Sequence, residues 1–172
     1  MNYIYVGKVV NTHGLKGEVK LISDFEYKND AFKKDIKLYI GDNKEEVIVN
    51  SYRVHQKYDM LTFKEINIIE DVLKYKGESV YINKEDIKIN DFFNEDLLGL
   101  DVYDKENKLG QIKKIELSKA HRIIYVNDKL RIPYVKEFVE KVDLKSNRIY
   151  INVIKGLIQD EDWYNNSFPI DV

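Results

Sequence analysis

The sequence opens with residues 3–22, YIYVGKVVNTHGLKGEVKLI, in which two strand-like runs flank a turn. Residues 3–10 and 18–22 are rich in β-branched and aromatic residues, the composition that favours a pleated, half-buried surface. The connector between them, residues 11–17, supplies the Asn and Gly residues that a turn between strands requires. Because so short a connector leaves no room for a parallel crossover, the stretch predicts two antiparallel strands.

The residues that follow continue the β-rich pattern as far as residue 83. Residues 41–43, Gly-Asp-Asn, form a good hairpin turn, and the short loops again favour antiparallel pairing. Residues 1–83 are therefore expected to form one compact, mainly β unit. The further strands predicted in it are residues 37–40, 46–54, 60–63 and 79–82.

One short helix interrupts this predicted β unit. Asn67 can cap its first turn, and Ile69, Val72 and Leu73 fall on one side of it. Gly77 can adopt the left-handed conformation that ends a helix. The sequence thus predicts a single helical excursion between residues 67 and 77.

A second β-rich unit is predicted from residue 92 to residue 159. It is separated from the first by residues 84–91, a polar and acidic stretch that we interpret as a linker. Pro133 fits the first helical position of a short amphipathic segment, residues 134–139. Residues 160–172 are acidic and are expected to form a tail of low order. The strands predicted in this unit are residues 98–103, 108–117, 122–126, 130–132 and 148–153, with turns at 104–107 and 127–128.

Composition sets limits on the class of protein. The 172 residues are 44% hydrophobic and contain no Cys, so the chain can form a core but no disulfide, thiolate nucleophile or iron–sulfur site. No secretory signal pattern opens the sequence, and no apolar run approaches the ~20 residues that span a bilayer. We therefore expect a cytoplasmic protein with no membrane partner.

Charge is unevenly distributed, although the formal net charge is only −2. Residues 105–155 hold thirteen Lys and Arg against six Asp and Glu, a local excess of seven positive charges. Such an excess can attract phosphate, and an ordinary solvated lysine face accounts for it equally well. The near-neutral total argues against a protein that coats nucleic acid indiscriminately.

The sequence contains little that indicates catalysis. Its three His residues lack the His-Glu-x-x-His spacing of a zinc site, and neither a Gly-x-Ser-x-Gly elbow nor a P-loop is present. Acid pairs such as Glu45-Glu46 and Glu70-Asp71 point apart on a strand or helix, so each would need other ligands to hold Mg²⁺. We predict no catalytic residue, no metal site and no cofactor.

Three segments are candidates for RNA contact. Residues 14–17 have the Gly-x-x-Gly spacing of loops that hold a nucleic-acid backbone, although a turn between strands is the better explanation of the glycines. Residues 52–58 interleave aromatic rings with cations, a pattern suited to stacking bases and equally expected of a hairpin. The candidates, with two lysines of the basic region, are His13, Gly14, Lys16, Gly17, Arg53, Lys57, Lys113 and Lys114.

Several motifs together resemble one known family. Residues 6–20, VGKVVNTHGLKGEVK, resemble the opening of the RimM ribosome maturation factors, and residues 92–102, FFNEDLLGLDV, resemble the start of the second domain of that family. IPYV at 132–135, VDL at 142–144 and RIYI at 148–151 follow in order with suitable spacing. The resemblance covers nearly the whole chain.

The resemblance implies a fold and a role. The fold is an N-terminal six-stranded antiparallel β-barrel like those of translation proteins, followed by a C-terminal PRC-barrel. The role is that of a non-enzymatic factor, a chaperone of ribosome assembly, that assists maturation of the head of the small (30S) subunit. Its implied partners are the immature small subunit, the small-subunit ribosomal protein numbered nineteen and the 16S rRNA, and we expect a monomer.

A partner-binding site is expected at the start of the second unit. The chain also departs from the family pattern at two places. Phe92 and Phe93 stand where the family usually has Tyr-Tyr, so they are either an apolar anchor for a partner or core residues; Leu98 and Gly99 belong to the same motif. Arg122 stands where the family commonly has an acid, which would invert the charge of the turn at residues 118–122. Two other functions remain open: a generic β-barrel RNA-binding or adaptor protein, and a metal-dependent RNA-processing enzyme.

Overall fold

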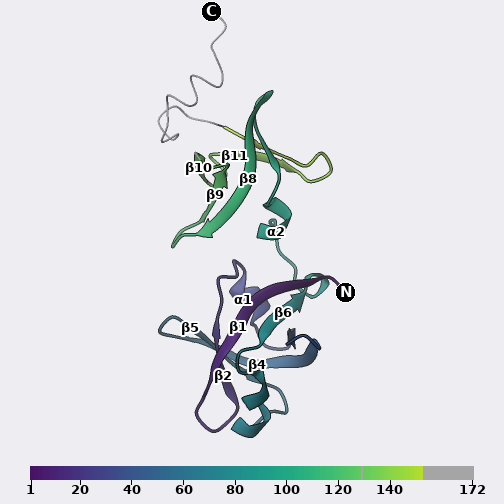
Figure 1. The fold of residues 1–172 in the computed structure, drawn as a ribbon, viewed down its shortest axis with the longest axis vertical. Helices are drawn as coiled ribbons and strands as arrows, with labels where there is room; N and C mark the ends of the chain where they lie inside the picture. The colour runs from purple at the N-terminus through teal and green to yellow at the C-terminus, as the bar shows by residue number, and fades with distance from the viewer. Residues whose placement is uncertain (129, 153–172) are drawn as a thin grey trace, which may run out of the picture. The chain divides into compact units, whose positions relative to one another are not determined.

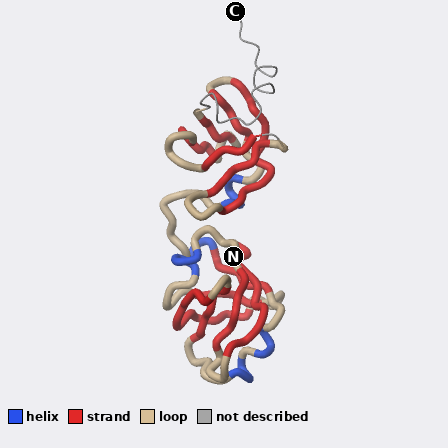
Figure 2. Tube along the Cα trace, turned by 90° about the vertical axis from the view of Figure 1, so that its left-hand side faces the viewer, coloured by secondary structure: helices blue, strands red, loops and turns tan. Residues whose placement is uncertain are grey.

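The computed structural model describes residues 1–128 and 130–152. The chain divides into two compact units, Met1–Asn90 and a second that begins at Asp91, and each is described by itself (Figure 1). Strands make up most of both units, with only short helical segments between them (Figure 2). The mainly β class predicted from the sequence is confirmed.

The first unit is a closed six-stranded barrel in which every neighbouring pair is antiparallel. The strands close in the order β1-β2-β5-β4-β3-β6. Closure leaves no unpaired sheet edge, which protects a small β domain from aggregation. The strands are β1 (Tyr3–His13), β2 (Glu18–Ile22), β3 (Lys37–Ile40), β4 (Glu45–His55), β5 (Tyr58–Phe63) and β6 (Ser79–Asn83).

Alternation along the strands separates the barrel core from its outer face. On β1, Ile4 and Val6 point inward and are at most 7% exposed, whereas Tyr5 between them points outward and is 55% exposed. The register with β6 shifts between Tyr5 and Gly7, and such an irregularity bends a strand. Gly7 is needed at this bend because a Cβ there would lie 2.8 Å from the carbonyl oxygen of Ile22.

The helix predicted between residues 67 and 77 is not formed. The segment folds as two 3-10 turns, Ile69–Asp71 and Leu73–Tyr75, and Ile68 rather than Asn67 precedes the first. Val72 and Tyr75 are buried while Leu73 is 52% exposed. The buried spacing is thus i, i+3, the repeat of a 3-10 helix, and the predicted apolar side was wrong in including Leu73.

A short helix that was not predicted, α1 (Lys28–Ala31), lies against the barrel. The Nζ of Lys28 lies 2.8 Å from Oδ2 of Asp59 in β5, and Tyr52 donates from its hydroxyl to the other oxygen of Asp59 at 2.7 Å. Asp59 is 1% exposed. A buried carboxylate with both oxygens engaged ties α1 to two strands of the barrel.

The second unit is a six-stranded sheet in the order β10-β9-β8-β7-β12-β11. All neighbouring pairs are antiparallel except β7 with β12, which run parallel. One hydrophobic cluster, which includes Leu97, Leu109 and Ile149, forms its core. The elements are α2 (Asn94–Leu97), β7 (Asp101–Asp104), β8 (Asn107–Leu117), β9 (Arg122–Val126), β10 (Leu130–Pro133), β11 (Val139–Asp143) and β12 (Arg148–Ile151).

Pro133 does not begin a helix. It is the last residue of β10, which lies at the end of the sheet order, where a residue without an N–H breaks no ladder hydrogen bond. The chain then turns, and Val139, predicted in the amphipathic segment, begins strand β11 instead. The predicted tail, residues 160–172, lies outside the described residues. Across residues 1–128 and 130–152, no helix is long and apolar enough to cross a membrane.

Candidate protein-binding and RNA-binding surfaces

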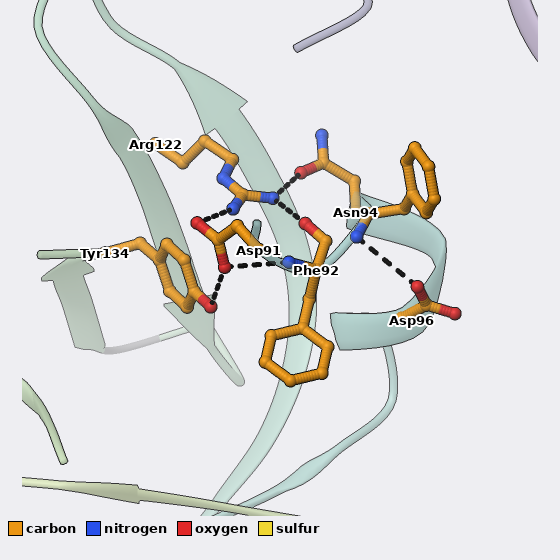
Figure 3. A network of polar contacts seen from close by, with 7 residues as sticks. Asp91, Phe92, Asn94, Asp96, Arg122 and Tyr134 are labelled. Carbon is orange, nitrogen blue, oxygen red and sulfur yellow. Dashed lines mark hydrogen bonds and ion pairs between the residues drawn. The ribbon is translucent and has the colours of Figure 1, made fainter. Parts of the chain in front are cut away.

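One buried guanidinium fastens the start of the second unit to strand β9. Arg122, the first residue of β9, is 6% exposed. Its Nη1 donates to the carbonyl oxygen of Phe92 at 2.7 Å and to Oδ1 of Asn94 at 3.0 Å (Figure 3). Its Nη2 donates to Oδ2 of Asp91 at 3.0 Å. Because the donors of a guanidinium form a rigid fork, these bonds fix the path of residues 91–94.

The second oxygen of Asp91 extends this network to Tyr134. Oδ1 of Asp91 accepts from the N–H of Phe92 at 2.7 Å and from the hydroxyl of Tyr134 at 2.8 Å. The guanidinium of Arg122 lies 4.4 Å from the centre of the Tyr134 ring, a cation–π distance. We name Asp91, Arg122 and Tyr134 the Arg122 latch. The expected inversion of charge in the turn at residues 118–122 does not reach the surface, because the Arg122 charge is buried and paired with Asp91.

The predicted partner-binding residues differ in exposure. Phe93 is 5% exposed, whereas Phe92 is half-buried and packs against the edge of the core cluster. Figure 3 shows the Phe92 ring extending away from the Arg122 guanidinium. Leu98, which follows α2, is 46% exposed, and Gly99 has the positive φ (83°) that turns the chain toward β7. The apolar surface offered here therefore consists of Phe92 and Leu98.

A second candidate surface lies at one end of the first barrel, where two hairpins meet. Glu18 stands opposite His13 in the β1–β2 pair, and its carboxylate accepts two hydrogen bonds from Arg53 of β4, at 2.6 and 3.0 Å. The ring centres of His13 and His55 are 6.1 Å apart. The fold thus brings the His13–Gly17 turn and the residue 53–58 hairpin together, although β5 separates β2 from β4 in the sheet.

Cations gather on this surface around Tyr58. Lys20 and Lys57 lie 4.7 and 5.4 Å from the centre of its ring. Of the residues predicted to contact RNA, those exposed here are His13, Gly14, Lys16, Arg53 and Lys57. We name this set, with His55, Lys20 and Tyr58, the barrel-end surface.

Gly17 differs from the other predicted RNA contacts at the barrel end because it is buried. A Cβ at that position would lie 3.2 Å from the carbonyl oxygen of Ile68, and its φ is +86°. Gly17 therefore shapes the turn and offers little surface of its own. The predicted RNA contacts did not include Lys20 or His55. His55 lies within the selected segment of residues 52–58, opposite Tyr58, whereas Lys20 joins the surface through its contact with the Tyr58 ring, which no local pattern indicates.

The Glu18–Arg53 pair makes barrel stability depend on pH. The hydrogen bonds from Arg53 hold the pKa of Glu18 below its ordinary value, and His13 and His55 act in the same direction against partial burial. A carboxyl with a lowered folded-state pKa stabilises the fold above its unfolded pKa of ~4.3, and this stabilisation is lost as pH falls through the folded value.

We therefore expect Glu18→Gln to destabilise the first unit at pH 7 by about 0.3–1 kcal/mol, a modest value because Arg53 is half exposed to solvent. The difference from the wild-type protein should shrink as pH falls below ~4.3 toward the lowered folded-state pKa of Glu18. Urea unfolding of both proteins at pH 7, 5 and 3 measures it. A difference that stays constant over this range would contradict the role given to the Glu18 charge.

The third candidate, Lys113 and Lys114, lies on β8 in the second unit. Lys114 stands opposite Tyr125, and Tyr125 stands opposite Arg131, so the three form a row across β8, β9 and β10. Lys114 and Arg131 lie 5.2 and 5.3 Å from the Tyr125 ring centre. Lys114 also pairs with Glu116, which offsets its charge, and Lys113 donates to Gln111. This row is basic but partly neutralised.

Over the described ranges, no three His, Asp or Glu side chains lie close enough together to hold a metal ion. The acid pairs at residues 45–46 and 70–71, which were considered as Mg²⁺ ligands, are not part of any such cluster. Glu45 accepts hydrogen bonds from Lys74 and Tyr75, and the second pair lies in the first 3-10 turn.

Comparison with known proteins gives a consistent result along the chain. Residues 4–87 match the family model of the RimM N-terminal domain, and residues 94–157 match that of the RimM PRC barrel domain. The ribosome maturation factors RimM of Streptococcus suis and Ligilactobacillus salivarius are each 36% identical to this chain. The alignments cover 91% of this chain and 98% and 99% of those proteins.

One solved structure aligns with most of the chain. It is that of the 16S ribosomal RNA processing protein RimM of Pseudomonas aeruginosa, which is 20% identical, with a TM-score of 0.46. The alignment covers 89% of this chain and 98% of that protein.

Proposed function

Because the chain belongs to the RimM family, and its relatives are ribosome maturation factors, we propose how this chain carries out ribosome maturation. It binds the immature small subunit at its head, contacting the small-subunit ribosomal protein numbered nineteen and nearby 16S rRNA. Its role is that of a non-catalytic assembly factor, and its place of action is the cytoplasm. The two units supply separate binding surfaces.

The protein-binding surface in this proposal is the pair Phe92 and Leu98. The observation that carries it is the Arg122 latch, because three hydrogen bonds to residues 91–94 hold the backbone beside Phe92 before any partner arrives. A preformed anchor loses little conformational entropy on binding, which is how a small apolar contact gains affinity. Phe92 keeps the ring of the family tyrosine but not its hydroxyl.

The RNA-binding surface in this proposal is the barrel-end surface. Lys16, Lys57 and Arg53 are exposed cations from two hairpins, and Glu18 is the carboxylate that pairs with Arg53. Cations held on one rigid face neutralise backbone phosphates without reading sequence, as contact with folded rRNA requires. Lys113 and Lys114 supply a weaker second contact, because Glu116 offsets one of them.

The double variant Phe92→Ala, Leu98→Ala tests the anchor. We expect it to remain folded, because neither side chain is fully buried, and to bind immature small subunits about ten- to a hundredfold more weakly. Quantitative co-sedimentation measures the affinity. The matched control is Leu117→Ala, Leu144→Ala, which removes two exposed apolar side chains of the same unit, 51% and 44% exposed.

Two outcomes would remove the anchor role. One is co-sedimentation of the double variant at wild-type affinity. The other is an equal loss in the control variant, which would show that any exposed apolar side chain of this unit matters as much as Phe92. An adaptor without a ribosomal role would show no affinity for immature subunits in any of the proteins tested.

A further inference from the structure

Four tyrosines lie side by side on the outer face of the first barrel. Tyr5 of β1, Tyr81 of β6 and Tyr39 of β3 stand opposite one another across three neighbouring strands, and Tyr3 precedes them on β1. The ring centres of Tyr3 and Tyr39 are 5.0 Å apart, those of Tyr5 and Tyr81 are 6.0 Å apart, and those of Tyr3 and Tyr81 are 6.5 Å apart. We name these four residues the tyrosine platform.

Three of the four platform tyrosines lie outside the barrel core. The inward positions of the same three strands, which include Ile4, Leu38 and Ile82, form the core and are at most 7% exposed. Outward positions of a small barrel are ordinarily polar. Here they carry aromatic rings, of which Tyr5 is 55% exposed, Tyr3 and Tyr81 are partly exposed, and Tyr39 is buried at 5% exposed. Core packing therefore accounts for Tyr39 but not for the solvent-accessible rings of Tyr3, Tyr5 and Tyr81.

A cation is placed over the platform. Lys44, in the turn between β3 and β4, has its Nζ 4.0 Å from the centre of the Tyr81 ring and 5.7 Å from that of Tyr3. Its backbone adopts a positive φ of 53°, and its Nζ also donates to the carbonyl oxygen of Gly41 at 3.4 Å. An ammonium group over the rings can pair with a phosphate while the rings contact bases.

Charged side chains of both signs surround the platform. Lys8 is the next outward residue of β1 after Tyr5, and it is exposed. Glu46 stands opposite Tyr39 but lies 3.5 Å from Lys37. Burial raises the pKa of the Tyr39 hydroxyl, and the negative charge of Asp86 acts in the same direction. Lys8, Lys37 and Lys44 are thus accompanied by Glu46 and Asp86, and the carboxylate of Glu78 lies beside Gly41 in the turn that carries Lys44.

We propose that the tyrosine platform binds unpaired bases of single-stranded RNA. Neighbouring strands are about 4.8 Å apart, so the accessible rings of Tyr3 and Tyr5 on β1 and Tyr81 on β6 offer a stacking surface for one or two nucleotides. Aromatic side chains on adjacent strands stack bases irrespective of sequence, and Lys44 pairs with the backbone phosphate beside them. This proposal rests on the RNA-binding role above and extends it from phosphate contact at the barrel end to base contact on another face.

The test measures binding of the full chain to a fluorescent 12-nucleotide oligouridine and to an RNA hairpin whose bases are paired. We expect Tyr5→Ala to weaken oligouridine binding about tenfold and to leave hairpin binding unchanged. Tyr5→Phe should retain wild-type affinity because stacking needs the ring and not the hydroxyl. The control is Leu73→Ala, which shortens an exposed apolar side chain elsewhere on the same barrel.

Three results would overturn the proposal: unchanged oligouridine binding by Tyr5→Ala, an equal loss in Tyr5→Phe, or weaker oligouridine and hairpin binding by the same factor. Lys44→Glu serves as a second variant whose substitution leaves every tyrosine in place, and it should also weaken oligouridine binding selectively. If Tyr5→Ala binds normally while charge reversal at the barrel end weakens hairpin binding, only the platform is wrong. If the wild-type chain binds neither RNA, the RNA-binding role itself is wrong.

Discussion

Replacing Arg122 by alanine is expected to open the start of the second unit and to destabilise that unit by about 3 kcal/mol. Loss of one partner from a buried ion pair typically costs ~3–5 kcal/mol. The lower end applies here because the side chain of Asp91 is 41% exposed and can be hydrated once Arg122 is gone. The carbonyl of Phe92 and the amide of Asn94 also lose a donor, and each such loss costs ~1–3 kcal/mol if the group stays buried.

Hydrogen exchange of the full chain measures this effect residue by residue. Amides of α2, β9 and β10 should exchange about a hundredfold faster in Arg122→Ala, whereas amides of the first barrel serve as an internal reference and should not change. Arg131→Ala is the matched control, because it removes an exposed arginine that also lies over a tyrosine ring. Wild-type exchange rates in Arg122→Ala, or equal effects of the two substitutions, would refute the latch.

Reversing two charges at the barrel end is expected to weaken RNA binding strongly. The double variant Lys16→Glu, Lys57→Glu removes two cations and adds two anions on exposed side chains of the two facing hairpins. We expect affinity for a structured RNA to fall about a hundredfold near 0.1 M salt. The slope of log K against log salt should flatten by about 2, because two fewer phosphates are neutralised.

The control for this prediction keeps the change in net charge and moves its position. Lys33→Glu, Lys34→Glu changes the total charge by the same amount on two exposed residues that follow α1. If RNA binding depended only on net charge, both variants would bind alike and the barrel-end surface would have no special role. Fluorescence anisotropy over a range of salt concentrations distinguishes the two cases.

Much of the fold was predictable because strand periodicity and turn chemistry are local. The predicted turns at residues 104–107 and 127–128 join strands as expected, and Lys105 and Asn127 there adopt positive φ values of 55° and 50°. The errors lie where two local signals disagree. The segment of residues 67–77 has caps and an apolar side, but its buried pair Val72 and Tyr75 follows a three-residue repeat that fits 3-10 turns.

The candidate sites were only partly predictable, because their residues meet through long-range pairing. Arg122 and Asp91 are 31 positions apart in the sequence, yet a hydrogen bond joins their side chains in the latch. No local pattern reveals that the arginine is buried, so the burial of its charge was not predicted. The tyrosines of the platform were not predicted as a site for the same reason. Their position became evident only from the register of β1, β6 and β3.

The central claim is that two separate surfaces of one non-catalytic chain hold the immature small subunit. Its most direct test is the affinity of immature small subunits for a variant that combines Phe92→Ala and Leu98→Ala with Lys16→Glu and Lys57→Glu. We expect each pair of substitutions to weaken co-sedimentation, their free-energy effects to add because the two pairs lie in separate units, and the combined variant to fail to co-sediment. Wild-type co-sedimentation of the combined variant would contradict the account.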